Sequence, residues 1–247
     1  MSQNDSAQIS LIGQRQDNQD RVNILASNGT VLLAVVDGMG GHAGGERAAE
    51  VTLESLGAQF SEADQPLLDP QGFLTLALAR AHDRVVELGE EHAMDHRPRA
   101  TCAVCLVQDG MAFWAHVGDS RVYLLRGTQV ADRTRDHSHV ELLLREGLIS
   151  EDEIKDHPMR NFVECCLGGD AALPDMTISA VKRLKPGDTL VVCSDGFWSG
   201  LPDGVLATKM TGTGPLQECL AELAESAVQA NAPYSDNTTA AALRWHS

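Results

Sequence analysis

The chain has 247 residues, and 43% of them are hydrophobic, enough for a folded core rather than a disordered chain. It carries 35 acidic and 19 basic residues, and a net charge of −16 repels phosphate backbones and argues against nucleic-acid binding. The N-terminus lacks a signal-peptide pattern and the aliphatic run Val31 to Val36 is too short to cross a bilayer, so we expect a cytoplasmic protein without a membrane partner.

The first third of the chain predicts strands followed by helices. Short apolar or alternating runs bounded by turn residues predict strands at residues 7–12, 21–26 and 30–36. A glycine-rich bend follows over residues 37–45. Two helical patterns come next, near 46–60 and 71–94, with prolines between them as breakers.

Strand patterns return after residue 100. They occupy residues 101–107, 111–117 and 121–125, and Asp109-Gly110 between the first two is a tight-hairpin signal. Residues 138–170 are mixed and polar, with short helical pieces at 140–146 and 151–155. The remaining elements are strands at 176–184 and 189–193, a helix near 215–230 and a last strand at 238–245.

These elements predict the fold class. Strands come in runs joined by short turns, with the long helices grouped outside them, which is typical of an α+β protein with antiparallel sheets. About eight or more strands exceed one small sheet, so we expect two packed sheets flanked by helices. The sequence shows no repeat or linker, and we expect a single domain over residues 1–247.

The six cysteines are expected to be reduced. Cys102 and Cys105 form a C-x-x-C within the apolar run TCAVCLV, but no second pair or histidine cluster completes a zinc pattern. Small thiols pack well in a core, and we expect these two to be buried there.

Four aspartates share one sequence context. Asp37 ends the run VLLAVV, Asp119 follows FWAHVG, Asp195 follows TLVVCS and Asp236 precedes the last strand. Carboxylates from separate strand ends can converge on one or two hard cations, which prefer oxygen ligands. Asp-Gly and Gly-Asp are also ordinary turn formers, so turn chemistry is the simpler interpretation for any one position taken alone.

Other chemistries are poorly supported. Gly38 to Ala43 fits the dinucleotide pattern G-x-G-x-x-A, but the strands and helices do not alternate as a doubly wound sheet requires. No cysteine is followed by the arginine of a cysteine-phosphatase cradle, and there is no H-E-x-x-H zinc motif.

Six blocks in order, within residues 9 to 243, resemble the metal-dependent protein phosphatase family of the protein phosphatase 2C type, in its compact bacterial form. They are G-x-R-x-x-N-Q-D from Gly13 to Asp20, VVDGMGGHAGGERAA, AHVGDSRVYLLR with TRDHS, HPMRN, LKPGDTLVVCSDGFW and SDNTT. The resemblance implies a four-layer αββα sandwich, in which two antiparallel sheets lie between helices.

The resemblance also implies a metal ligand set. Asp37 matches the carboxylate that bridges two metals, and the Gly38 carbonyl matches a further ligand. Asp195 and Asp236 match the other ligands of the first metal. Asp20 matches a carboxylate that supports the second metal through water. The cations implied are two Mn²⁺ or Mg²⁺ ions.

Further positions carry over with two departures from the family pattern. Asp119 matches the aspartate of a third, weaker metal, and Arg15 matches the arginine that clamps the substrate phosphate, a role that suits its planar fork. Gln19 replaces a common glutamate, which puts the second metal in question. Met39 replaces a general-acid histidine, so protonation of the leaving group is unassigned, with a metal-bound water or His42 as candidates.

The implied activity is hydrolysis of phosphoserine or phosphothreonine in proteins, by direct attack of a metal-bridging hydroxide and without a phosphoenzyme. The implied partners are phosphorylated proteins. A bacterial Ser/Thr kinase would oppose the enzyme, and forkhead-associated or secretion-apparatus proteins are substrates suggested by analogy. Residues 134–170 resemble a mobile flap beside the active site that shapes protein-substrate choice.

Three alternative functions stay open on the sequence alone. A pseudophosphatase would share every block, and Gln19 and Met39 are its only support. A regulatory phosphatase for one partner-switching protein is the second. A nucleotide-dependent oxidoreductase built on the glycine loop is the third, and it ranks last.

Overall fold

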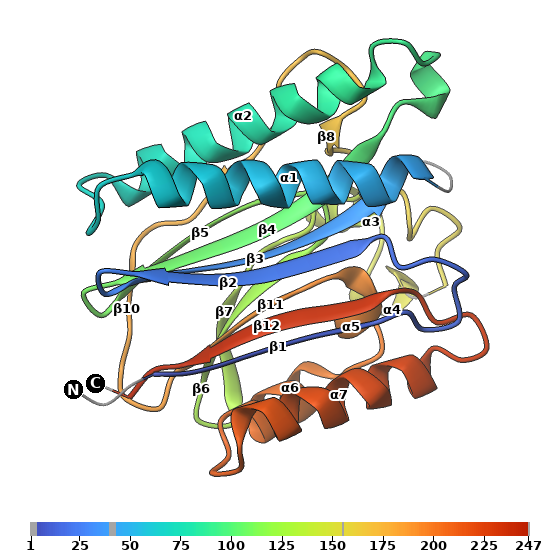
Figure 1. The fold of residues 1–247 in the computed structure, drawn as a ribbon. Helices are drawn as coiled ribbons and strands as arrows, with labels where there is room; N and C mark the ends of the chain where they lie inside the picture. The colour runs from blue at the N-terminus through green and yellow to red at the C-terminus, as the bar shows by residue number, and fades with distance from the viewer. Residues whose placement is uncertain (1–3, 40–42, 155, 247) are drawn as a thin grey trace.

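The computed structural model describes residues 4–39, 43–154 and 156–246 and places them in four layers (Figure 1). One outer layer consists of α1 (Ala43–Glu62) and α2 (Pro70–Gly89), and the other of α6 (Asp203–Met210) and α7 (Leu216–Ala230). Two antiparallel sheets lie between them. The αββα sandwich expected from the sequence is confirmed.

The first sheet packs under α1 and α2. Its strand order is β10-β5-β4-β3-β2, while β8 pairs with β4 and β9 pairs with β5. The strands are β2 (Asp20–Ser27), β3 (Thr30–Met39), β4 (Arg99–Gln108), β5 (Met111–Val117), β8 (Leu167–Gly168), β9 (Thr177–Ile178) and β10 (Lys182–Arg183).

The second sheet packs on α6 and α7 and has the strand order β1-β12-β11-β6-β7. Its strands are β1 (Asp5–Leu11), β6 (Arg121–Arg126), β7 (Gln129–Arg133), β11 (Thr189–Cys193) and β12 (Thr238–Arg244). The short helices are η1 (Met94–His96), α3 (His139–Arg145), α4 (Glu151–Ile154) and α5 (Asp195–Trp198).

The apolar core follows the two-residue period of the central strands. On β4, Cys102 and Val104 face α1 and α2, while Ala103 and Cys105 face the second sheet. A strand covered on both faces needs a continuous apolar run, which is how the sequence reads there. All six cysteines are free thiols, and burial raises the pKa of Cys102 to about 12, so its expected packing role is confirmed.

Several boundaries differ from the sequence prediction. The single strand expected at 176–184 is instead the two short strands β9 and β10, because the Trp114 N–H donates to the Ser179 side-chain hydroxyl and interrupts the ladder. The helix expected to reach residue 94 ends at Gly89, which packs closely against Arg97 and Pro98. Strands β7 and β8 and helices α5 and α6 were not predicted.

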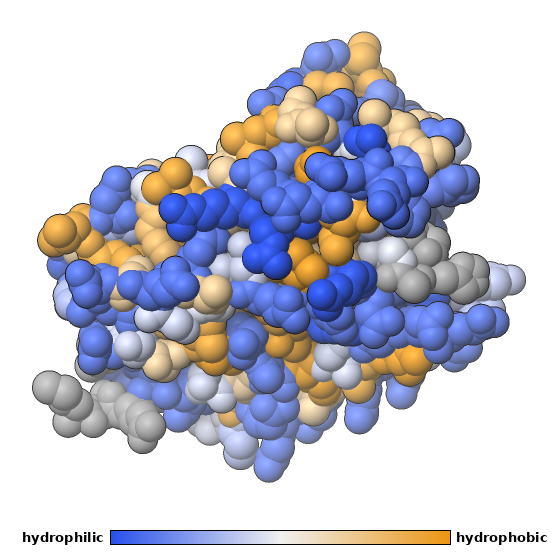
Figure 2. All heavy atoms as spheres, turned by 45° about the horizontal axis from the view of Figure 1, so that its top comes forward, coloured by the Kyte–Doolittle hydropathy of each residue, from blue (hydrophilic) through white to orange (hydrophobic). Residues whose placement is uncertain are grey.

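The side chains on one face of the molecule are mostly polar. Figure 2 shows a predominantly hydrophilic face on which hydrophobic residues are scattered in small groups. Within the described parts of the chain, no helix combines the length and the apolar character needed to span a bilayer.

Candidate metal centre

The predicted aspartates lie at one end of both sheets. Asp37 near the end of β3 is directly opposite Asp20 at the start of β2. Asp195 follows β11 as the first residue of α5, and Asp236 stands two residues before the neighbouring strand β12. Asp119 lies in the turn between β5 and β6. The antiparallel topology therefore brings together five carboxylates that are far apart in the sequence.

Burial and mutual repulsion perturb these carboxyl groups. Burial, followed by repulsion from Asp20 and Asp195, raises the pKa of Asp37 well above its usual value. The pKa of Asp195 is raised in the same way, with Asp119 as its strongest charged neighbour. Burial also raises the pKa of Asp20 to about 6 and that of Asp119 to about 7. Carboxylates that lie close together with little hydration are stabilised in their charged form by a cation between them.

Two carboxylate oxygens in the cluster are buried without a hydrogen-bond partner. They are Oδ1 of Asp20 and Oδ1 of Asp195. The other oxygen of Asp20 accepts a hydrogen bond from the Ser194 hydroxyl at 2.7 Å. Buried unpaired carboxylate oxygens are costly, and a hard divalent cation would satisfy them. The residues present therefore fit such an ion.

The ligand set is not assembled into a closed shell. Among residues 4–39, 43–154 and 156–246, no three His, Cys, Asp or Glu side chains form a group with metal-site geometry. Asp20 and Asp37 are nevertheless paired across β2 and β3, and repulsion from neighbouring carboxylates contributes to the raised pKa of Asp37. Like charges repel when no cation lies between them, so an open arrangement is the physical expectation.

Arg15 lies at the rim of this cluster. Its Nη2 donates to Oδ2 of Asp236 at 2.6 Å, and the two side chains are 56% and 39% exposed. The guanidinium is thus beside the carboxylates and open to solvent. Its predicted contact with a substrate phosphate stays a prediction, as does the Gly38 carbonyl as a ligand.

The comparisons with known proteins match this architecture. The family model described as protein phosphatase 2C matches residues 8–231. The chain belongs to this family. Protein phosphatase PhpP of Streptococcus pneumoniae is similar, with 30% identity over 234 residues that cover 93% of each chain. The protein is accordingly a metal-dependent serine/threonine protein phosphatase.

Solved structures of phosphatases share the fold. The serine/threonine phosphatase of S. agalactiae is 29% identical, with a TM-score of 0.89 over 98% of this chain and 99% of that one. The catalytic domain of the phosphatase PstP, solved in complex with two manganese ions, is 26% identical, with a TM-score of 0.81 over 99% of each chain. PppA of Pseudomonas aeruginosa, described as a key regulatory component of the T6SS, is 28% identical, with a TM-score of 0.80 over 98% of each.

At two glycines of the phosphatase site the backbone lies very close to a neighbouring segment. A Cβ atom at Gly38 would lie 2.0 Å from the Gly45 carbonyl oxygen, and one at Gly13 would lie 2.2 Å from the Asp236 carbonyl oxygen. Gly13 also has a φ of +63°, which favours glycine. Side chains at these two positions would push apart segments that carry predicted ligands.

The structure places both residues that depart from the family pattern, Gln19 and Met39. Gln19 is held by its backbone, whose N–H donates to Asn237 Oδ1 at 2.8 Å and whose carbonyl accepts from the Gly38 N–H at 3.2 Å. Met39 is the last residue of β3. His42, one candidate for protonating the leaving group, lies outside the described residues.

Sequence reasoning did not assign roles to several residues that support the phosphatase site. Asn237 joins the loops, because its Nδ2 donates to the carbonyls of Ile12 and Asp17. Ser194 orients Asp20. Both residues stand beside predicted ligands in the SDNTT and VVCSDGFW blocks, and that adjacency was the available signal.

A cationic side chain ties the Asp119 turn to the base of the flap. Arg121 makes two hydrogen bonds of 2.7 Å to the carboxylate of Asp136 and lies 3.4 Å from the ring centroid of Trp198. The Trp198 Nε1–H donates to the Asp119 carbonyl at 2.9 Å. Asp136, near the start of the predicted flap, is therefore anchored to the elements that carry Asp119 and Asp195.

Proposed function

We propose that residues 1–247 form one catalytic domain in which the aspartate cluster holds two Mn²⁺ or Mg²⁺ ions. Asp37, the Gly38 carbonyl, Asp195 and Asp236 would hold the first ion, and Asp37 with Asp20 would hold the second. Asp119 contributes to a third, weaker position. The observation that carries this proposal is the set of buried carboxylates with raised pKa values and unpaired oxygens.

The donor chemistry supports the choice of cation. Carboxylate and carbonyl oxygens suit Mg²⁺ and Mn²⁺, whereas zinc sites commonly use sulfur and imidazole. PstP with its two manganese ions supports the same choice. When bound, such ions neutralise charge on the phosphoryl oxygens and lower the pKa of a coordinated water that can act as the nucleophile.

The side chains of the protein supply binding and orientation. Arg15 can exchange its bond to Asp236 for a bidentate contact with the substrate phosphate, since guanidinium and phosphoryl oxygens match in geometry. Ser194 fixes one oxygen of Asp20, so that the other can face a cation. Because the carboxylates must be ionised to bind a cation, their raised pKa values make activity fall toward acid pH.

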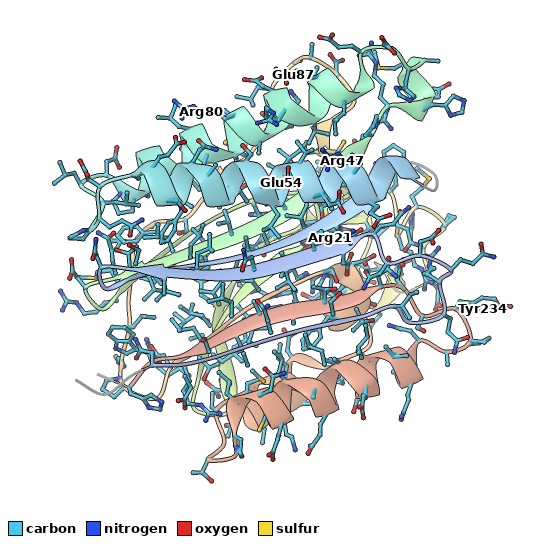
Figure 3. All side chains as sticks on the ribbon, in the orientation of Figure 1. Arg21, Arg47, Glu54, Arg80, Glu87 and Tyr234 are labelled. Carbon is cyan, nitrogen blue, oxygen red and sulfur yellow. The ribbon has the colours of Figure 1, made fainter. Side chains whose placement is uncertain are left out.

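The proposed substrates are proteins phosphorylated on serine or threonine in the cytoplasm, where the enzyme opposes a bacterial Ser/Thr kinase. PppA, which is similar over nearly its full length, is described as a regulator of a secretion system. Secretion-apparatus proteins therefore join forkhead-associated proteins as candidates. An exposed aromatic residue, Tyr234, projects outward from the loop that leads to Asp236 (Figure 3) and offers apolar surface to a substrate chain.

Hydrolysis of p-nitrophenyl phosphate with Mn²⁺, before and after EDTA, tests the proposal. Turnover that needs the cation and returns when Mn²⁺ is restored would support it. No turnover, together with tight binding of a phosphopeptide, would instead favour a pseudophosphatase. A titration with NAD(H) tests the oxidoreductase alternative, for which we expect no binding.

A further inference from the structure

A cavity of about 380 Å³ lies beside the metal centre, at the base of the flap. Residues of β5, β7, β10 and α3 line it, together with residues 134–137. Its volume falls within the range of pockets that bind small ligands or side chains.

The lining of this cavity is cationic in a protein that is strongly anionic. Arg133, Arg135, Arg145 and Lys182 face three carboxylates, Asp132, Asp136 and Glu141. Of these three, Asp136 is already paired with Arg121, which leaves four cations and two carboxylates. Over the whole chain the acidic residues outnumber the basic ones, 35 to 19. The local excess of positive charge therefore runs against the overall charge.

Two of these cationic side chains have no strong ion pair with a described residue of the protein. Arg145 is exposed, and among the described residues its side chain has no ion pair or hydrogen bond. The side chain of Arg135 is 80% exposed, and its Nη1 is 4.0 Å from Glu141 Oε1, the limit of an ion pair. By contrast, Lys182 pairs with Asp132 and also lies 5.5 Å from the Trp114 ring centroid. Arg135 and Arg145 are therefore available to an external anion.

The cavity adjoins the turn that carries Asp119. His137 lines the cavity, and its N–H donates to the Gly118 carbonyl at 2.9 Å. Asp136 lines it too, and its charge contributes to the raised pKa of Asp119. An extended peptide advances about 3.3–3.6 Å per residue, so the residues that flank a phosphorylated residue at the centre are the ones that extend toward this cavity.

We propose that this cavity is a substrate subsite that binds an acidic side chain, or a second phosphorylated residue, flanking the phosphoserine or phosphothreonine that is hydrolysed. Carboxylate and phosphate share the chemistry that guanidinium groups recognise. The inference rests on the proposed function and adds to it a substrate class, acidic phosphoprotein segments. Exposed ion pairs are weak singly, so the subsite selects among substrates and does not take part in the reaction.

Four phosphothreonine peptides that differ only in their flanking residues test the subsite. The flanks are glutamate, glutamine, lysine or a second phosphoserine, and kcat/KM is measured for each with Mn²⁺. For the wild-type enzyme we expect the glutamate peptide to exceed the lysine peptide by about ten-fold. The phosphoserine arm reports whether the doubly charged group is preferred to the carboxylate. The preference should collapse in 0.5 M NaCl, because salt screens exposed charges.

The decisive variant is Arg135→Gln with Arg145→Gln. It should reduce the preference for glutamate over lysine to about two-fold or less, while hydrolysis of p-nitrophenyl phosphate is retained. Arg135→Lys with Arg145→Lys keeps the charges and should keep most of the preference. Arg80→Gln is the matched control, because Arg80 is an exposed arginine on the outer face of α2, away from the cavity (Figure 3).

The outcomes separate the subsite from the proposed function. An unchanged peptide preference in the Gln variant would overturn the subsite, as would an equal loss on p-nitrophenyl phosphate and all peptides with a native circular dichroism spectrum. The single Arg145→Gln variant gives the same test with a smaller expected change if the double variant does not fold. A wild-type enzyme that hydrolyses no ester with Mn²⁺ would instead refute the proposed function itself.

Discussion

The aspartate cluster and the cationic cavity adjoin each other but are built differently. The aspartates lie at or near the ends of strands, where Asp20 and Asp119 are buried. Lost hydration and mutual repulsion raise the pKa values of Asp20, Asp37, Asp119 and Asp195. The cavity arginines stand on β7, α3 and the segment between them, with much of their side chains in solvent. Buried charges require a partner, whereas exposed ones cost little and gain little.

This contrast predicts where substitutions matter. Changes in the aspartate cluster should alter metal binding and turnover by orders of magnitude. Changes around the cavity should alter substrate choice by small factors.

Asp37→Asn should reduce turnover of p-nitrophenyl phosphate by about 10²–10³-fold or more, because the shared anionic ligand is lost. Without metal, the variant should be at least as thermally stable as the wild type, since the substitution removes a buried carboxylate surrounded by like charges. Steady-state kinetics and a thermal melt in EDTA measure the two effects. A variant that keeps most of its activity would exclude Asp37 as a ligand.

Ser194→Ala should weaken the response to Mn²⁺ by about 10–100-fold, because residues that orient ligands commonly contribute that much. The Ser194 hydroxyl donates to Asp20 at 2.7 Å within the buried cluster. The measurement is activity against Mn²⁺ concentration. Ser194→Thr keeps the hydroxyl and should recover most of the affinity, and equal behaviour of the two variants would argue against an orienting role.

Shortening the flap tests the other side of the comparison. Ser138 bridges Val163, and the His139 N–H donates to the Phe162 carbonyl at 3.0 Å, so the flap base is closed. Replacing residues 140–161 with a short Gly-Ser linker keeps this base and the Arg121–Asp136 pair. We expect turnover of p-nitrophenyl phosphate to stay within about two-fold and activity on a phosphoprotein to fall about ten-fold. An equal loss of both activities would contradict the assignment of the flap to substrate choice.

The pH dependence of stability should give the smallest effect. The folded-state pKa values of Asp20, about 6, and Asp119, about 7, lie above the usual 3.8, so the folded protein binds more protons than the unfolded chain across that interval. In EDTA, these carboxyls therefore make stability fall as the pH rises from about 4 to about 7. We expect the melting temperature of the wild type to fall by about 5 °C relative to Asp20→Asn over this range.

Asp20→Asn is the required reference because His116 acts in the opposite direction. Burial lowers the pKa of His116 to about 4, and the neutral ring adds stability as the pH rises. Differential scanning of both proteins cancels that contribution. A difference that is constant with pH would show that Asp20 does not titrate as the buried cluster requires.

Much of the fold was readable from the sequence because local patterns specify it. The alternation along β4, the hairpin at Asp109-Gly110 and the run of β3 predicted strands that the structure contains, within a few residues. Prediction failed where tertiary contacts decide the local structure. The break between β9 and β10 depends on the Ser179 hydroxyl replacing a backbone acceptor, and no pattern in the sequence encodes that bond.

The sequence predicted which residues hold the metal ions, because short aspartates at the ends of apolar runs can be recognised one at a time, and because their motif blocks resemble a family. Only the tertiary structure decided how they meet: Asp20 opposite Asp37, Ser194 on Asp20, and Arg121 linking Asp136 to Trp198. It also decided that cations from β7, α3 and β10 share one cavity. The physical reason is that side-chain identity is local, whereas burial and charge proximity depend on how distant segments pack.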